Sequence, residues 1–120
     1  MKKKILCFDL DNVICTTQKN YYSLSKPKKK VVKLINFLYE NGYYIKIFTA
    51  RGMGQFKRDK KKINKNIKGL TLLQLKKWGV QYHELILFKP SYDIFIDDKS
   101  LSFNSSWTSH LLKELKIKNI

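Results

Sequence analysis

The sequence predicts an α/β fold, in which a parallel sheet is covered by helices on both faces. Short apolar runs rich in β-branched and aromatic residues alternate along the chain with amphipathic helical segments. Such alternation implies right-handed crossovers between parallel strands. Polar residues at the ends of the apolar runs give a further indication, because the functional crevice of such a sheet lies beyond the carboxyl ends of its strands.

The first part of the chain predicts a strand, a flap and a helix. Residues 4–10 (KILCFDL) are typical of a buried strand, and the polar residues 12–26 are long for a simple turn, so we expect a flap there. Pro27 suits the first turn of a helix, Ser25 suits its cap and Gly42 suits its end. Four apolar residues recur between them at the spacing of one helical face: Val31, Leu34, Ile35 and Leu38.

The middle of the chain predicts a second strand and a second helix. Residues 44–48 (YIKIF) are typical of a strand, and the glycine-rich sequence TARGMG follows them. Residues 70–78 predict a helix that ends at Gly79. Residues 57–68 are mostly lysine and asparagine, and both a solvated helix and a mobile loop fit them. A charge run of this kind is usually a solvated face, although it could bind a polyanion.

The last part of the chain predicts two further strands and a closing helix. The strands are expected over residues 85–88 and 94–96, and the helix over residues 110–115. A chain of 120 residues has room for one core, so we expect a single domain over residues 1–120.

Polar residues follow all four predicted strands, and parallel strands bring such residues to one edge of the sheet. In chain order they are Asp9 and Asp11, Thr49 and Arg51, Lys89, and Asp97 and Asp98. Four of the nine acidic residues therefore meet in a chain whose net charge is +16. The side chains of Asp9 and Asp11 leave the first strand on the same side, and two like charges cost stability there unless a cation or a shared proton compensates.

The chemistry of this edge favours magnesium and a phosphoryl group. Carboxylate oxygens are hard ligands that suit Mg²⁺, and Mg²⁺ also takes phosphate oxygens. Cysteine and histidine are absent from these strand ends, which argues against zinc. A lysine and a threonine hydroxyl beside the metal would complete a receptor for a phosphoryl group.

These motifs resemble those of the haloacid dehalogenase (HAD) superfamily of phosphotransferases, and the resemblance covers nearly the whole chain. FDLDNV matches the first motif, a pair of aspartates directly after a strand. Thr49 in IFTAR matches the second motif, Lys89 in LFKP the third, and Asp97 and Asp98 in IDD the fourth. The resemblance implies a Rossmann-like, HAD-like fold and a phosphatase that uses Mg²⁺.

The resemblance also implies roles for the acidic residues. Asp9 would be the nucleophile that forms an aspartyl-phosphate. Asp11 would protonate the leaving alcohol and then take a proton from the hydrolytic water. Mg²⁺ would be held by Asp9, by the main-chain carbonyl of Asp11 and by Asp97 or Asp98, of which Asp98 is favoured.

Further residues of the matching motifs would bind the substrate. Thr49 and the backbone N–H groups of Asn12 and Ala50 would bind the phosphoryl group, and Lys89 would offset its charge.

Three residues leave questions open. Arg51 could grip a substrate phosphate, or it could pair with Asp97 or Asp98. Ser102 stands where many members of the superfamily carry a further acid, so metal binding could rest on both aspartates of the last motif. Asn12 replaces a commoner glycine, and asparagine tolerates a left-handed backbone.

The expected absence of a cap domain bears on the kind of substrate. The segments after the first two strands are too short for a folded cap domain. Cap-less members of the superfamily often leave the site open to large substrates or close it by oligomerisation, so a homo-oligomer is one expectation. IFTARGM and KPSYDIFIDDKS are similar to a small cap-less group linked with capsule and surface-polysaccharide gene clusters, which implies a sugar phosphate. The alternatives are a nucleotide or polynucleotide end, which the positive charge would suit, and a non-catalytic accessory role.

The cysteines and the first residues bear on the compartment. Cys7 and Cys15 form no CxxC pair, and Cys7 is expected to be a small buried hydrophobe. The N-terminal MKKK and the apolar run after it superficially resemble a signal peptide, but Asp9 and Asp11 break that run and no small-residue cleavage site follows. No apolar run approaches the length of about 20 residues that spans a bilayer. We therefore expect a cytoplasmic protein that does not enter a membrane.

Overall fold

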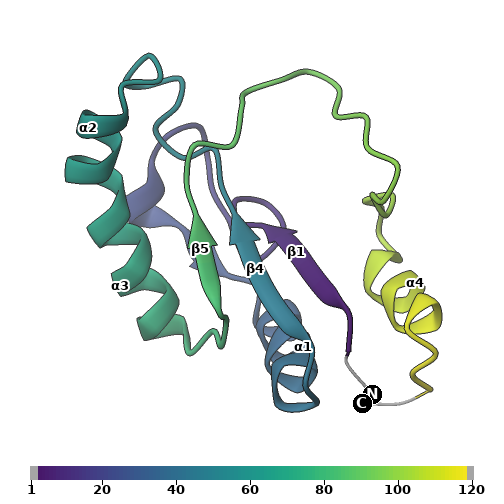
Figure 1. Cartoon of the computed structure of the whole chain (residues 1–120). Coiled ribbons are helices and arrows are strands. Elements are labelled where there is room, and N and C mark those ends of the chain that lie inside the picture. Colours follow the sequence, from purple (N-terminus) through teal and green to yellow (C-terminus); the bar gives the residue numbers. More distant parts are fainter. Residues whose placement is uncertain (1–2, 119–120) are drawn as a thin grey trace.

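Three parallel strands form the centre of the molecule. The computed structural model describes residues 3–118. The strands lie side by side in the order β1 (Ile5–Asp9), β4 (Tyr44–Phe48), β5 (Glu84–Ile86) (Figure 1). Asp9 is in register with Phe48, and Phe48 with Ile86, so the carboxyl ends of all three strands meet at one edge. The predicted α/β fold with a parallel sheet is confirmed.

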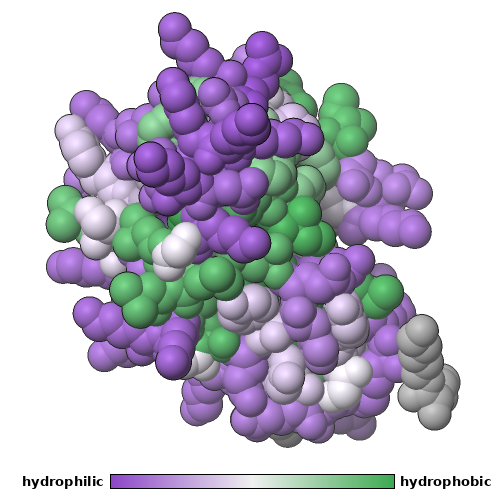
Figure 2. Space-filling view, turned by 60° about the vertical axis from the view of Figure 1, so that its left-hand side comes forward, coloured by the Kyte–Doolittle hydropathy of each residue, from purple (hydrophilic) through white to green (hydrophobic). Residues whose placement is uncertain are grey.

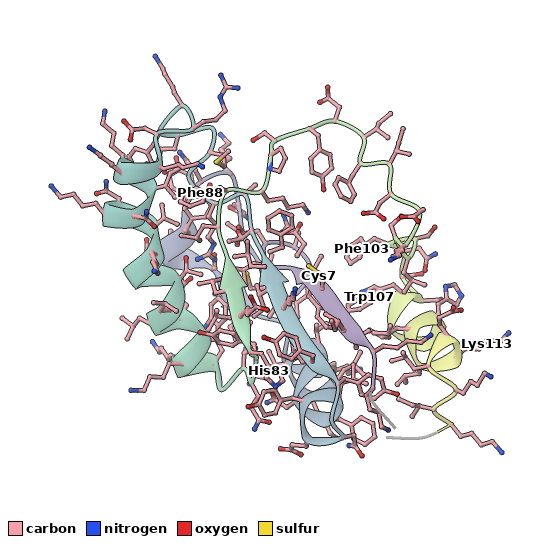
Figure 3. The ribbon with its side chains drawn as sticks, viewed as in Figure 1. Cys7, His83, Phe88, Phe103, Trp107 and Lys113 are labelled. Atoms are coloured by element: carbon pink, nitrogen blue, oxygen red, sulfur yellow. The ribbon has the colours of Figure 1, made fainter. Side chains whose placement is uncertain are left out.

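Three helices share one apolar core with this sheet. They are α1 (Lys29–Glu40), α3 (Gly69–Trp78) and α4 (Trp107–Glu114). The three parallel strands contribute the buried residues Phe8, Ile45 and Ile47 to that core. Helix α4 lies beside β1 (Figure 1), and Figure 3 shows Trp107 at the start of that helix. The ring of Trp107 meets the ring of Phe8 edge-on, with 6.4 Å between the centroids. The N-terminal strand and the C-terminal helix are therefore packed together.

The opposite face of the sheet is open within residues 3–118. Tyr44 and Cys7 are exposed on it, and Figure 3 shows Cys7 on this side of β1. Alternation along β1 turns Cys7 away from the face that carries Phe8, so the prediction of a buried Cys7 is wrong. Cys15 is the buried thiol. Helical cover of the second face, which the sequence also predicts, is not found in the described part of the chain.

The flap (residues 12–26) is an ordered hairpin. Its elements are β2 (Cys15–Thr16), the short 3-10 helix η1 (Tyr22–Leu24) and β3 (Lys26–Pro27), and β2 pairs antiparallel with β3. Pro27 thus lies in a strand, and α1 begins two residues later, not at the proline as predicted. Ser25 does not cap the helix, because its hydroxyl lies 2.6 Å from the hydroxyl of Thr17.

The lysine-rich residues 57–68 are largely helical, which decides between the two predicted alternatives. They hold α2 (Lys60–Ile63) and a π-helical stretch, η2 (Asn64–Lys68), which runs directly into α3. Ile63 and Ile67 are buried against Met53 and Leu87, whereas the lysines are exposed. Gly79 ends α3 in the left-handed conformation, with φ of 72°. The run is therefore a solvated basic face held down by two isoleucines.

The predicted strand over residues 94–96 is not formed. Ile94 is 79% exposed and Ile96 is 92% exposed. They belong to a long connection, residues 90–104, which we call the arch; it leaves β5 and reaches α4 above the ends of the strands (Figure 1). A strand needs a neighbour for its backbone hydrogen bonds, and this segment pairs with none in the described part of the chain. The apolar run IFI thus has the composition of a strand without its pairing.

Hydrophobic and hydrophilic side chains occupy different parts of the surface. Figure 2 shows hydrophobic side chains across the middle of one face and hydrophilic side chains above them, where α2 lies. None of the helices described is both long enough and apolar enough to cross a bilayer.

Candidate active site

Asp9 and Lys89 form an ion pair at the carboxyl edge of the sheet. Asp9 ends β1, and its Oδ2 lies 3.6 Å from Nζ of Lys89, which follows β5. The N–H of Leu10 donates to Asp9 Oδ1 at 2.8 Å. Burial raises the pKa of Asp9 above its ordinary value, and the charge of Lys89 and the Leu10 N–H work against that rise. The edge therefore presents a partly desolvated carboxyl group directly beside a cation.

The side chain of Lys89 is held among aromatic rings. Its Nζ lies 5.2 Å from the ring centroid of Tyr92, 5.4 Å from that of Phe95 and 5.9 Å from that of Phe48. Burial alone would lower the pKa of Lys89, but the neighbouring Tyr92 side chain and the Asp9 carboxylate raise it above its ordinary value. Phe88, the preceding residue, has φ of 69°, a left-handed conformation that a bulky side chain rarely adopts (Figure 3). Lys89 is thus a fixed cation.

The loops after β4 and β5 are joined by a backbone hydrogen bond. The N–H of Lys89 donates to the carbonyl oxygen of Thr49 at 3.1 Å. Thr49 is fully buried, and its Oγ1 accepts from the N–H of Arg51 at 3.1 Å. Within residues 3–118 the N–H of Ala50 has no hydrogen-bond partner, which leaves it free for an anion. The structure therefore brings Thr49 and Lys89 together, as predicted from the sheet edge.

Asp11 pairs with Arg51. Arg51 Nη2 lies 3.0 Å from Asp11 Oδ1, and Arg51 Nε lies 3.1 Å from both carboxylate oxygens. The guanidinium is buried, so loss of either partner leaves an uncompensated charge, which typically costs about 3–5 kcal/mol. Of the two alternatives for Arg51, the structure shows pairing with an acidic residue, and that residue is Asp11, not Asp97 or Asp98.

Asn12 is a turn residue in this structure. Its φ is 67°, in agreement with the expectation that asparagine tolerates this position in place of glycine. Its N–H donates to the carbonyl oxygen of Cys15 at 2.6 Å, and its side-chain oxygen accepts from the N–H of Thr17 at 3.2 Å. The N–H that the sequence assigned to a phosphoryl group is therefore engaged within the flap.

Asp97 and Asp98 lie in the arch, apart from the other acidic pair. Both are exposed, and Asp97 Oδ1 accepts from the N–H of Lys99 at 2.8 Å in a local turn. The charge of Asp97 contributes to raising the pKa of Cys7, which follows mainly from partial desolvation of the thiol by neighbouring side chains. Within residues 3–118 no three acidic, histidine or cysteine side chains gather as a metal site would require. The structure thus assembles the first three predicted motifs and not the fourth.

Three residues of the site were missed from the sequence. Thr17 donates from Oγ1 to Asp11 Oδ1 at 2.6 Å, and Thr71 and Gln74 of α3 accept from Arg51 Nη1 at 3.2 and 2.6 Å. All three are buried polar side chains. The signal for α3 was a glutamine and a threonine on the buried side of a helix; nothing in the polar flap singled out Thr17.

Comparison with known proteins supports the fold. A Vibrio cholerae protein, an MCSG target of known crystal structure, matches with a TM-score of 0.77 at 26% identity; the match covers 92% of this chain and 98% of that one. One chain of the Pnkp1/Rnl/Hen1 complex matches with a TM-score of 0.55 at 13% identity, over 94% of this chain and 34% of that one. One chain in a structure of the Pnkp1/Rnl/Hen1 RNA repair complex matches with a TM-score of 0.51 at 15% identity, over 94% of this chain and 31% of that one.

A further structure has a stated activity. D,D-heptose 1,7-bisphosphate phosphatase from B. bronchiseptica, complexed with magnesium and phosphate, matches with a TM-score of 0.50 at 12% identity, over 95% of this chain and 64% of that one. No protein-family model matches this sequence, and no curated protein matches it either. The parallel sheet, its strand order and these likenesses together show an α/β, Rossmann-like fold of the HAD type.

Proposed function

We propose that this chain is a Mg²⁺-dependent phosphomonoesterase that hydrolyses a phosphorylated small metabolite, a sugar phosphate, through an aspartyl-phosphate. The observation that carries this proposal is the Asp9–Lys89 pair at the carboxyl edge of the sheet, with Asp11 two residues further on. The likeness to a phosphatase complexed with magnesium and phosphate supports the same chemistry.

The residues at this edge supply a balanced reaction. A carboxylate oxygen of Asp9 attacks phosphorus, the bond to the leaving oxygen breaks, and that oxygen takes a proton from Asp11. Water then attacks the aspartyl-phosphate, gives a proton to Asp11 and releases phosphate, which restores the Asp9 carboxylate. Lys89 offsets negative charge throughout, and the N–H of Ala50 and the hydroxyl of Thr49 are the proposed donors to the phosphoryl oxygens.

The donor set at the end of β1 fits Mg²⁺ in kind, because Asp9 and the main-chain carbonyl of Asp11 offer oxygen alone. We propose Asp98 or Asp97 as the further ligand. When bound, Mg²⁺ would draw charge from the phosphoryl oxygens. The described residues leave the set incomplete, since both aspartates of the last motif are exposed in the arch.

Completion of the metal site therefore requires the arch to move toward β1. The outer edge of β1 pairs with no strand in the described part of the chain, and residues 94–96 have the β-branched and aromatic composition of a strand. Docking there would remove Ile94 and Ile96 from water and satisfy backbone groups on both sides. We propose that Mg²⁺ and substrate favour this docked arrangement.

The basic residues 57–68 favour a second class of substrate, nucleotides or polynucleotide ends. The basic residues 57–68 are held by Ile63 and Ile67 against Leu87, two residues before Lys89, so a positive face adjoins the site. A nucleotide or polynucleotide end would use that face, and one structural likeness is to an RNA repair complex. An accessory, non-catalytic role is the third candidate.

The test is phosphate release from a panel of sugar phosphates, nucleotides and 5′- or 3′-phosphorylated oligonucleotides, with Mg²⁺ or with chelator. Metal-dependent turnover of a sugar phosphate is the expected result. Turnover confined to nucleotides or oligonucleotides, with steep salt dependence, would favour the second class. Absence of turnover while Mg²⁺ binds would favour an accessory role.

A further inference from the structure

Arg51 is a buried arginine whose donors are all used inside the protein. Nη1 donates to Thr71 Oγ1 and Gln74 Oε1, and Nη2 donates to Asp11 Oδ1 and to Ser25 Oγ at 3.2 Å. Nε is shared between the two oxygens of Asp11. With 1% of its surface exposed, the side chain has no donor left for a substrate. Burial of a charged side chain costs free energy, so we ask what role the buried Arg51 serves.

The two oxygens of Asp11 are held very differently. Oδ1 accepts from Arg51 Nη2 at 3.0 Å, from Thr17 Oγ1 at 2.6 Å and from Arg51 Nε, and Cys15 Sγ lies 3.6 Å away. Oδ2 accepts from Arg51 Nε alone, at 3.1 Å. Oδ1 is therefore saturated by donors, whereas Oδ2 keeps a lone pair that can carry a proton.

The same network ties the flap to the rest of the site. The hydroxyl of Ser25 lies within hydrogen-bond distance of both Thr17 and Arg51. Gln74 Nε2 donates to the carbonyl oxygen of Tyr22 at 2.6 Å, and the Tyr22 ring lies 5.0 Å from the guanidinium. The orientation of the Asp11 carboxyl group thus depends on the flap and on α3 at once.

We propose that Arg51 and Thr17 are positioning residues, which fix the Asp11 carboxyl group by Oδ1 and thereby present Oδ2 as the oxygen that gives its proton to the leaving group. This inference rests on the proposed phosphatase function. Arg51 acts through Asp11 and does not touch the substrate.

Leaving groups of different basicity test the proposal. An alkyl phosphate expels a strongly basic alkoxide and needs the proton, whereas 4-nitrophenyl phosphate expels a stabilised phenolate and needs it far less. In Arg51→Lys and Thr17→Val we expect kcat/KM for an alkyl phosphate to fall by about 100-fold or more, within the usual contribution of a general acid, and that for 4-nitrophenyl phosphate by less than about tenfold. Thr16→Val is the matched control for Thr17→Val, because Thr16 is the exposed neighbour of Thr17 in β2, and it should change neither value.

The ratio of the two kcat/KM values separates positioning from a purely structural role. Equal losses on both phosphates in folded variants would overturn the proposal. If Arg51→Lys does not fold, Thr17→Val decides the question, since it removes one donor to Oδ1 and leaves the buried charge paired; thermal unfolding checks that it folds. A wild-type protein that hydrolyses neither phosphate refutes the phosphatase function and this inference with it, whereas a wild-type protein that turns over with an unchanged ratio in the variants refutes the inference alone.

Discussion

The molecule has two pairs of aspartates, each of which follows an apolar run in the sequence. Their surroundings in the structure differ. Asp9 ends and Asp11 follows a strand that is paired along its length with β4, and each has a cationic partner, Lys89 or Arg51. Asp97 and Asp98 follow a similarly apolar segment, yet they are exposed and, within residues 3–118, the segment is unpaired.

The difference shows that the position of an acidic pair is fixed by the strands and partner residues around it. The first pair is fixed because backbone pairing, burial and two ion pairs all act on the same few residues. The second pair has only a local turn around Asp97. Under the proposed function, the arch brings to the site charges whose position depends on a ligand.

Among the variants that test this difference between the two pairs, Asp9→Asn has the largest expected effect on turnover. An amide cannot attack phosphorus as a carboxylate does, so we expect turnover to fall by about a thousandfold or more. Asp93→Asn, an exposed change in the arch, is the control and should turn over as the wild type does. Phosphate release measures both, and near wild-type turnover in Asp9→Asn would refute the covalent mechanism.

Asp97→Asn and Asp98→Asn test whether the second pair joins the first. Loss of a carboxylate ligand should raise the Mg²⁺ concentration needed for half-maximal turnover by about tenfold or more, and the residue with the larger effect is the direct ligand. Titration of activity against Mg²⁺ gives this value for each variant. Unchanged Mg²⁺ dependence in both variants would leave the arch outside the metal site.

The pH dependence of protein stability tests whether burial of Asp9 raises its pKa. The pKa of Asp9 is raised by burial, so the folded state holds its proton more tightly than the unfolded state. The stability contributed by this group is fully present below its unfolded pKa and is lost as pH rises through the folded pKa. In chelator, we therefore expect Asp9→Asn to stabilise the protein relative to wild type more at pH 7 than below about pH 4. Denaturant unfolding at both pH values measures this, and an equal difference at the two values would contradict it.

The smallest effect is on the reactivity of Cys7. Cys7 is exposed on the open face near the free edge of β1, and partial desolvation by its neighbours raises its pKa, so alkylation should be slow at neutral pH and faster in alkali. If Mg²⁺ and beryllofluoride, a mimic of the aspartyl-phosphate, dock the arch on β1, the alkylation rate of Cys7 at fixed pH should fall severalfold. Mass spectrometry follows it, with buried Cys15 as the internal reference. An unchanged rate would speak against docking at this edge.

Much of the fold follows from local pattern alone. The apolar runs of β1 and β4, the helical face of α1 and the glycine that ends α3 are each decided within a few neighbouring residues, and the structure has them where the sequence predicts. Because parallel strands share one direction, their order also places Asp9, Thr49 and Lys89 at one edge.

Only the tertiary structure decided the partners of the charges. Nothing near Arg51 in sequence points to Asp11, forty residues away, or to Gln74 on another helix. It also decided that Cys7 faces the open side of the sheet and that residues 94–96 are unpaired. Local periodicity reports what a segment can become, whereas ion pairs and sheet pairing depend on which distant segment lies beside it, and that is set by packing of the whole chain.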